Sequence, residues 1–251
     1  MKTKSSVLRL QPERNEATSS VRHLTVGTGN TPVFVIDNYY PEPNILLSQL
    51  SLSRFTQRED DHYPGLRHQS PPAYVEFNAV SLPHLLSHYL QNHDNDFNEY
   101  ATRWSDATLS ISQFSMATFG AAALKPIQCI PHIDTHSENE WAMVHYLFSA
   151  PLGGTAFYRH KETYLERVTS RNYVQYMNTL KRQATTVGLP PRAYIDDDSA
   201  LFEKIGQVDA AFNRAIVYPA NLLHSGLLPN HMQLPTCLET GRVTANACFV
   251  Y

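Results

Sequence analysis

The feature that most constrains the fold is a series of strand-like segments that fills much of the chain from residue 107 to its end. These segments are short, rich in β-branched and aromatic residues, and alternate apolar with polar side chains, a pattern typical of β-strands. They read ATLSISQFSMATF, PIQCIPHID, AMVHYLF, GTAFYRH, RAIVYPA and RVTANACFVY. The sequence therefore predicts a β core built mainly from the second half of the chain.

One stretch, 162–206, interrupts this series. Within it, TSRNYVQYMNTLKRQATTV predicts a helix that stops at GLPPR, and DDDSALFEKIG predicts a second, shorter helix capped by an aspartate or serine. The insertion could cover a functional site, because variable segments on a rigid scaffold often carry specificity. The alternative is that 171–187 only packs Val174, Met177 and Leu180 on the outside of the core.

The N-terminal part of the chain supplies flanking helices. Residues 1–20 are polar and predict a flexible arm. TVGTGNTPVFVIDNYY predicts a strand, a Gly-Asn turn and a second strand, PEPNILLSQL a short helix, and SLPHLLSHYLQNH an amphipathic helix. Neither a repeat nor a linker divides the rest, so we expect residues 21–251 to form a single domain, mostly β with flanking helices.

Composition narrows the classes of function. The 251 residues are 42% hydrophobic and carry a formal net charge of −3, which indicates one sizeable core and no basic surface for nucleic acid or an anionic membrane. No apolar run is long enough for a signal peptide or a membrane span. The three cysteines are odd in number and widely spaced, which argues against a disulfide framework. We expect a cytoplasmic protein that binds neither nucleic acid nor membrane, and the oligomeric state stays open.

The stretch IPHIDTHSENE, residues 130–140, concentrates side chains that can bind metal. If 127–134 is a strand, His132 and Asp134 point to the same face and could share an ion. THSENE is polar and turn-like, so we expect the strand to end near Asp134 and His136 to lie at the rim without binding the metal. An H-x-D pair alone is a weak signal.

A third ligand must come from elsewhere, and RAIVYPANLLHSG predicts a strand that ends with His224, 92 residues after His132. Two histidines and a carboxylate with open positions form the facial triad of non-haem Fe(II) oxygenases. The alternative for His224 alone is a hydrogen-bonded histidine near a strand end. His132, Asp134 and His224 are the candidate metal-binding and catalytic residues.

The last strand-like segment, GRVTANACFVY, places Arg242, Thr244, Asn246 and Cys248 on one face. An arginine and a hydroxyl that point into an apolar barrel are costly unless they meet an anion. A dicarboxylate would satisfy them. The alternative is that Arg242 points outward and pairs with a surface acid.

Taken in order, these motifs resemble the 2-oxoglutarate- and Fe(II)-dependent oxygenases, in their prolyl-hydroxylase-like branch. More narrowly, they are similar to a bacterial group of uncharacterised proteins, DUF6445, over about residues 33–251. The motifs are VFVIDNYYPEP, PIQCIPHID, HYLF, GGTAFYRHK, AIVYPANLLHSG and GRVTANACFVY. The resemblance implies a double-stranded β-helix core of the jelly-roll or cupin type, with the helical insertion at 162–206.

The resemblance also implies roles for six residues and a set of cofactors. The roles are Fe(II) ligation for His132, Asp134 and His224, and binding of the cosubstrate 2-oxoglutarate for Arg242, Thr244 and Tyr146. With O₂ as the oxidant, the activity implied is that of a dioxygenase. It would oxidise an unidentified substrate, with hydroxylation expected, and release succinate and CO₂.

Two features depart from the family pattern, and two other functions stay open. The insertion lengthens the gap between Asp134 and His224, and Arg242 follows His224 by 18 residues, so the loop LLPNHMQLPTCLETG would have to bulge out. The other functions are a non-catalytic β-sandwich binding protein with a vestigial metal site and a zinc hydrolase that uses His132, Asp134, His136 and a water. The substrate stays open among small molecules, amino acids and peptides.

Overall fold

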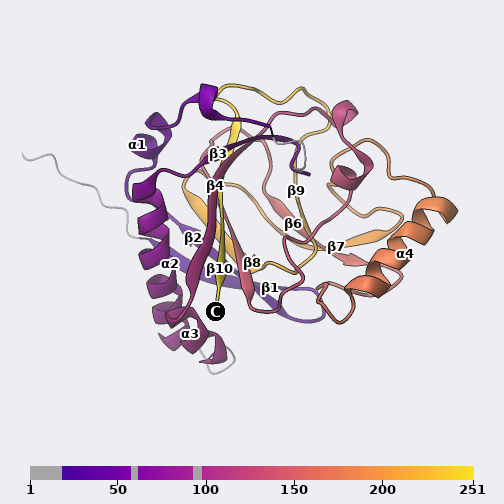
Figure 1. Cartoon of the computed structure of the whole chain (residues 1–251), viewed down its shortest axis with the longest axis horizontal. Helices are drawn as coiled ribbons and strands as arrows, with labels where there is room; N and C mark the ends of the chain where they lie inside the picture. The colour runs from indigo at the N-terminus through magenta and orange to yellow at the C-terminus, as the bar shows by residue number, and fades with distance from the viewer. Residues whose placement is uncertain (1–18, 58–61, 93–97) are drawn as a thin grey trace, which may run out of the picture.

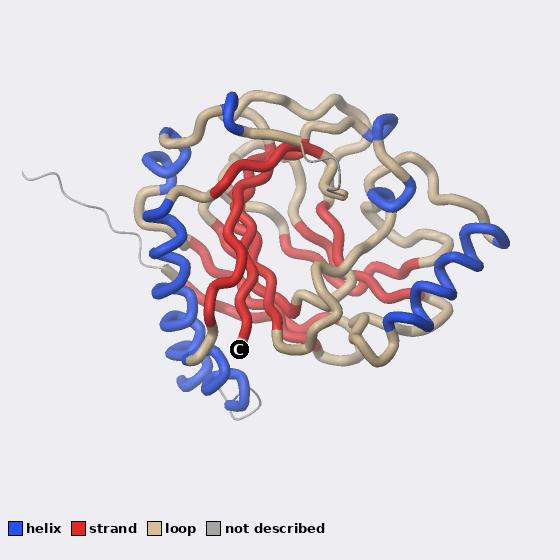
Figure 2. The backbone as a smooth tube through the Cα atoms, viewed as in Figure 1, coloured by secondary structure: helices blue, strands red, loops and turns tan. Residues whose placement is uncertain are grey.

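The computed structural model describes residues 19–57, 62–92 and 98–251. It contains two antiparallel sheets with helices along their outer sides (Figure 1, Figure 2). The large sheet runs, in spatial order, β1 (Ser20–Val26), β2 (Thr31–Asp37), β8 (Arg214–Pro219), β5 (Glu140–Tyr146), β10 (Arg242–Val250), β4 (Thr108–Ala117) and β3 (Gly65–Gln69). The small sheet runs β7 (Phe202–Val208), β6 (Thr155–His160) and β9 (His224–Gly226). The α-helices are α1 (Pro43–Ser48), α2 (Pro72–Asn92), α3 (Asn98–Ser105) and α4 (Tyr173–Thr186).

The strand order is that of a double-stranded β-helix of the jelly-roll type. From β4 onward the chain passes back and forth between the sheets: β4, β5, β8 and β10 pair in the large sheet, and β6, β7 and β9 in the small one. β1 and β2 extend the large sheet beyond β8, and β3 extends it beyond β4. The predicted fold class, mostly β with flanking helices around a jelly-roll core, is confirmed.

The N-terminal predictions of a hairpin and two helices are also confirmed, as β1, β2, α1 and α2. Of the predicted arm at 1–20, residues 1–18 lie outside the described residues, and Ser20 already belongs to β1. α2 begins earlier than its amphipathic pattern indicated, at Pro72, where a proline costs no helical hydrogen bond.

The two faces of the large sheet have different neighbours, because side chains alternate along each strand. On the outer face, Val243 of β10 belongs to one buried cluster with Leu86 of α2 and Trp104 of α3. The inner face is turned toward the small sheet, and the alternate positions of β10, beginning with Arg242 and Thr244, belong to it. These polar residues therefore point into the interior of the jelly roll.

The strand predicted at 127–134 is not formed. Pro126–Cys129 is a 3₁₀ turn, and the motif pairs through an isolated bridge between His132 and His224. The two prolines of PIQCIP have no N–H group to donate to a sheet, which explains why no regular strand forms there. The predicted strand RAIVYPANLLHSG is likewise two strands, β8 and β9, that belong to different sheets.

The second helix predicted within 162–206 is wrong, because its residues from Phe202 onward form β7 and pair with β6. The acidic and hydroxyl groups ahead of it close a turn instead of capping a helix. Asp198 Oδ1 accepts the backbone N–H of Lys204 at 2.8 Å, and Ser199 Oγ accepts that of Phe202 at 3.0 Å. The insertion therefore ends before β7, and its last predicted residues belong to the core.

The first predicted helix of the insertion is present as α4, which lies along the small sheet at one edge of the molecule (Figure 1). It buries Tyr176, with Met177 and Leu180 packed partly against the same cluster. Val174 does not take part, since it is 68% exposed. The alternative that this helix packs on the outside of the core therefore holds for Met177 and Leu180, and Tyr176 takes the place expected for Val174.

Two predictions from composition can be compared with the structure. Cys129, Cys237 and Cys248 are all free thiols. No helix in the described part of the chain has the length and apolar character needed to cross a membrane. The expected cytoplasmic location stays a prediction.

Candidate metal centre and anion site

The three predicted metal ligands meet beside the small sheet. Donor atoms of His132, Asp134 and His224 all lie within 4.8 Å of one another. The two imidazole rings have centroids 4.3 Å apart, and Nε2 of His224 lies 3.6 Å from Oδ2 of Asp134. This spacing brings the three groups within reach of one ion, whose bonds to nitrogen and oxygen would be about 2.0–2.2 Å long.

Backbone hydrogen bonds hold the three ligands together. His132 and His224 each donate an N–H to the other's carbonyl oxygen at 2.9 Å, and Asp134 donates its N–H to the carbonyl oxygen of Ala220 at 2.9 Å. The H-x-D motif is therefore tied to the segment that carries His224 at two points. The motif achieves the predicted grouping of His132 and Asp134 without a regular strand.

The three side chains also have lone pairs that no hydrogen bond uses and that a metal could accept. Nδ1 of His224 lies 2.8 Å from the carbonyl oxygen of Leu222, which accepts its proton and leaves the Nε2 lone pair for an ion. Among the described residues, neither the His132 ring nor the Asp134 carboxylate has a hydrogen-bond partner. Three ligating groups are thus grouped together without being consumed by other contacts.

The protonation state of His132 suits ligation as well. Its side chain remains open to solvent, yet the protein packed around it, followed by the nearby His224, lowers the pKa of His132 to about 4. The ring is therefore neutral at pH 7. A neutral imidazole is the form that binds a metal.

Arg242 lies at the start of β10 and is only 5% exposed. Its Nε donates to the carbonyl oxygen of Leu152 at 3.2 Å and its Nη2 to that of Gly154 at 3.0 Å. No carboxylate of the described residues lies within ion-pair distance of it, so the alternative of an outward-facing arginine paired with a surface acid is wrong. A buried guanidinium without a counter-charge is costly, which makes the surroundings of Arg242 a candidate anion site.

Gly226 brings the backbone of β9 close to the guanidinium of Arg242. Positions 224 and 226 share one face of β9. A Cβ atom at Gly226 would lie 2.6 Å from Cδ1 of Leu228 and 3.5 Å from Nη2 of Arg242. The loop 227–241 therefore returns the chain to a point beside β9, and the 18-residue interval does not separate the guanidinium from the metal ligands.

Tyr146 and Thr244, the two predicted helpers, lie side by side on neighbouring strands, paired in register between β5 and β10. The hydroxyl oxygen of Tyr146 lies 2.8 Å from Oγ1 of Thr155. Burial raises the pKa of Tyr146 to about 12, with Thr155 and then Arg242 opposing the rise. Tyr146 is therefore a protonated group within electrostatic reach of the arginine.

Tyr218 is a residue of this region to which the sequence analysis assigned no role. It lies near the end of β8, and its ring centroid is 4.9 Å from that of His224. Burial raises the pKa of Tyr218 well above its ordinary value, Asp134 adds to the rise, and Arg242 opposes it. Its hydroxyl is thus within electrostatic reach of both the metal ligands and the anion site.

A row of polar groups crosses the same inner face, and two of its members, Arg67 and Ser115, had no role in the sequence analysis. Ser115 Oγ accepts hydrogen bonds from Nη1 of Arg67 at 2.9 Å and from Nδ2 of Asn246 at 2.8 Å. Asn246 also donates to Oγ1 of Thr244 at 3.3 Å. Ser115 pairs in register with both Arg67 and Thr244, so only the strand pairing, absent from any local pattern, could have brought these residues together.

His136 is not part of the metal-binding cluster that the described residues form. Its ring lies 5.3 Å from that of Tyr173, at the start of α4, and its carbonyl oxygen accepts the N–H of Ser170. The start of the insertion is thus attached to the segment that follows Asp134. This placement agrees with the prediction that His136 lies at the rim.

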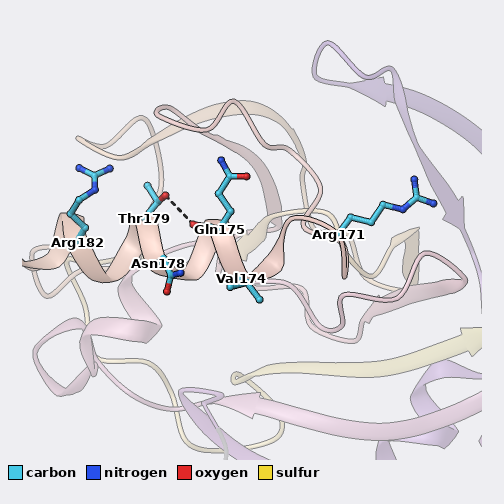
Figure 3. Close-up of a pocket in the computed structure, with 6 residues that line it drawn as sticks. All are labelled: Arg171, Val174, Gln175, Asn178, Thr179 and Arg182. Carbon is cyan, nitrogen blue, oxygen red and sulfur yellow. Dashed lines mark hydrogen bonds between the residues drawn. The ribbon is translucent and has the colours of Figure 1, made fainter.

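A shallow groove of about 620 Å³ runs along α4 (Figure 3). The side chains that line it are Arg171, Val174, Gln175, Asn178, Thr179 and Arg182. None of them belongs to the metal or anion site, so the groove is a separate surface feature of the insertion.

Fold and site together define a class: a jelly-roll protein with two histidines and one carboxylate grouped as a potential metal site. The chain belongs to DUF6445, a family of unknown function, whose model matches residues 17–249. The family indicated by the sequence motifs is thereby confirmed. A comparison with curated proteins found no match.

Three solved structures illustrate the distant similarities. HygX from Streptomyces hygroscopicus with nickel and 2-oxoglutarate bound is 13% identical, with 88% of this chain and 83% of that chain covered and a TM-score of 0.42. The non-heme alpha ketoglutarate dependent epimerase SnoN from nogalamycin biosynthesis is 9% identical, with 87% and 78% covered and a TM-score of 0.41. EctD from S. alaskensis with bound Fe is 12% identical, with 96% and 87% covered and a TM-score of 0.34.

Proposed function

We propose that this chain is a non-haem Fe(II)- and 2-oxoglutarate-dependent dioxygenase that oxidises a small-molecule, amino-acid or peptide substrate, with hydroxylation as the expected outcome. The observation that carries the proposal is Arg242, a buried guanidinium without a carboxylate partner among the described residues. Gly226, against which this guanidinium lies, is two positions along β9 from His224. A dicarboxylate that reaches from the metal ligands to Arg242 would satisfy both ends.

The metal end of the site uses groups that are already oriented. His132, Asp134 and His224 would hold Fe(II) on one side and leave its remaining positions open to the interior. The carbonyl oxygen of Leu222 keeps the His224 ring turned so that Nε2 faces the ion. Bound Fe(II), with 2-oxoglutarate and O₂, supplies the oxidising chemistry that no side chain here provides.

The anion end positions the cosubstrate. Arg242 offers a planar guanidinium that matches a carboxylate in charge and shape. Its two hydrogen bonds to the carbonyl oxygens of Leu152 and Gly154 fix its orientation before any ligand binds. Tyr146 and Thr244 place hydroxyl groups on the same inner face, where they can donate to the same carboxylate.

The two rival functions fit these observations less well. A zinc hydrolase would need His136 as a ligand, and that ring instead lies beside Tyr173. A non-catalytic binding protein has no need to combine an open metal-binding set with a buried arginine. The zinc hydrolase also leaves Arg242 without a role, whereas the dioxygenase uses it.

The test is an anaerobic titration of the purified protein with Fe(II) and then with 2-oxoglutarate. We expect a weak visible absorption that appears only when both are present and is absent from His132→Ala. Admission of O₂ should then produce succinate. A protein that binds Fe(II) but neither binds 2-oxoglutarate nor develops the absorption would overturn the proposal.

A further inference from the structure

The inference concerns the hydroxyl group of Tyr218 and rests on the proposed function. Tyr218 belongs to the large sheet, but its ring reaches across to the small one. Its ring centroid lies 5.2 Å from that of Phe157 in β6 and 4.9 Å from that of His224 in β9. The side chain therefore spans the interior beside a proposed metal ligand.

The hydroxyl of Tyr218 has no hydrogen-bond partner among the described residues, although the residue is only 1% exposed. Two other tyrosine hydroxyls of this region already have a partner within the protein. Tyr146 is hydrogen-bonded with Thr155, and Tyr194 donates to the carbonyl oxygen of Phe119 at 2.7 Å. The hydroxyl oxygen of Tyr218 is not among the fully enclosed unpaired atoms of the described residues, so it borders space that a ligand group can reach, and a polar group in such a position can bind a ligand.

The position of Tyr218 limits which part of a ligand it can reach. It is paired in register with Ala142 of β5, which in turn is paired with Cys248 near the end of β10. Arg242, at the opposite end of β10, lies six residues away along that strand. Tyr218 is therefore nearer to the metal ligands than to the start of β10, while still within electrostatic reach of Arg242.

We propose that Tyr218 is a positioning residue whose hydroxyl donates a hydrogen bond to the end of the bound 2-oxo acid that lies next to the metal. Arg242 binds the far carboxylate, and Tyr218 orients the 2-oxo carboxylate group. This division uses a guanidinium without a carboxylate partner and a hydroxyl without a hydrogen-bond partner among the described residues. It also explains why a tyrosine, and not another aromatic residue, lies against His224.

The experiment compares Tyr218→Phe with the unmodified protein in anaerobic Fe(II) titrations with 2-oxoglutarate. Loss of a hydrogen bond to a charged group should weaken 2-oxoglutarate binding by about 10- to 150-fold. Fe(II) affinity and the thermal unfolding midpoint should not fall, because the ring and its packing are retained. The matched control is Tyr176→Phe, which removes a buried hydroxyl without a partner from α4, and it should bind 2-oxoglutarate normally.

A second ligand, 2-oxopentanoate, assigns the contact to one end of the cosubstrate, because it lacks the far carboxylate. With it, the loss caused by Arg242→Gln should disappear, while the loss caused by Tyr218→Phe should persist. Normal 2-oxoglutarate affinity in Tyr218→Phe, or a loss of Fe(II) affinity in that variant, would overturn this role for Tyr218 and leave the proposed function standing. Failure of the unmodified protein to bind 2-oxoglutarate would overturn both.

Discussion

Oδ2 of Asp134 lies 3.6 Å from Nε2 of His224, on the edge of the imidazole ring opposite the nitrogen that faces the carbonyl oxygen of Leu222. The two residues are 90 positions apart in the sequence. They meet because the isolated bridge between His132 and His224 places the H-x-D motif beside β9. The contact aligns a carboxylate with the one ring nitrogen that remains available to a metal.

The first prediction separates the ligands from the nearby histidine. Single alanine substitutions of His132, Asp134 or His224 should each greatly reduce bound iron, because each removes one donor from a three-donor set. His136→Ala is the matched control and should retain iron, since its ring lies beside Tyr173. Bound iron is measured after anaerobic loading and desalting. Equal loss in His136→Ala and His132→Ala would show that the ligand set is wrong.

The second prediction concerns the anion site. Arg242→Ala should weaken 2-oxoglutarate binding by roughly 1.5–3 kcal/mol, about 10- to 150-fold in affinity, and barely change iron binding. The measurement is an anaerobic binding titration. Arg159→Ala is the control, because that arginine pairs with Glu203 on the small sheet, and it should bind 2-oxoglutarate normally. Unchanged affinity in Arg242→Ala would place the anion anchor elsewhere.

The third prediction tests how α4 is attached. Tyr176→Ala should lower the free energy of unfolding by about 3–5 kcal/mol, because it removes a buried aromatic ring from the cluster between α4 and the small sheet. Val174→Ala, on the exposed side of the same helix, should change it by less than about 0.5 kcal/mol. Urea unfolding measures both. Similar small changes in the two variants would show that α4 does not pack as described.

The insertion at 162–206 could also cover the substrate site, and this role needs a different test from the packing of α4. If the insertion covers the substrate, changes on its site-facing side should reduce coupling between 2-oxoglutarate consumption and substrate oxidation, without affecting iron or 2-oxoglutarate binding. Charged replacements along the groove of Figure 3 should have no such effect, because none of its lining residues is a proposed ligand of the metal or of the anion.

The fourth prediction is a pH dependence that arises from His145 on the outer face of the large sheet. Its Nε2 donates to Oδ1 of Asn213 and its Nδ1 accepts from the hydroxyl of Tyr74, both at 2.9 Å. Burial lowers the pKa of His145 to about 4, whereas the unfolded chain has a value near 6.5. Between these values the unfolded state binds more protons, so stability is fully present above about pH 6.5 and falls as the pH drops toward 4.

The size of this effect is up to about 3 kcal/mol, from roughly 2.5 pKa units at 1.36 kcal/mol each. Urea unfolding of the metal-free protein at several pH values between 4 and 7 should show a steeper dependence in the unmodified protein than in His145→Gln. His132 contributes to the dependence in both proteins and does not affect the difference. Identical slopes would show that His145 is not held neutral in the folded state.

The sequence patterns were most successful where the deciding physics is local. Alternation in GRVTANACFVY placed Arg242 and Thr244 on one face, and the structure has them on the interior face of β10. Alternation failed in PIQCIPHID, where two prolines prevent a regular strand. The helix-capping signal failed in DDDSALFEKIG, where side chains that can cap a helix close a turn instead. In both failures the residue types favoured two local structures, and pairing with a distant strand decided between them.

Tyr218 shows which part of the candidate site could not be predicted from the sequence. Alternation in RAIVYPA could have placed it on the same face as Ile216, but not beside His224, which belongs to another sheet. Arg67 and Ser115 were missed for the same reason, since their contacts with β10 depend on the register of β3 and β4. A local pattern specifies the face of a strand and not the strand that lies next to it.

The sequence by itself determined the kinds of groups available: a donor set of two histidines and a carboxylate, and an arginine on the polar face of the last strand. These follow from ligand chemistry and from the two-residue repeat of a strand, which are properties of neighbouring residues. Only the tertiary structure decided that His224 pairs with His132, that Gly226 lies against Arg242, and that the hydroxyl of Tyr218 is left free beside them. Those relationships arise from strand pairing and burial between segments far apart in the chain, which no short stretch of sequence encodes.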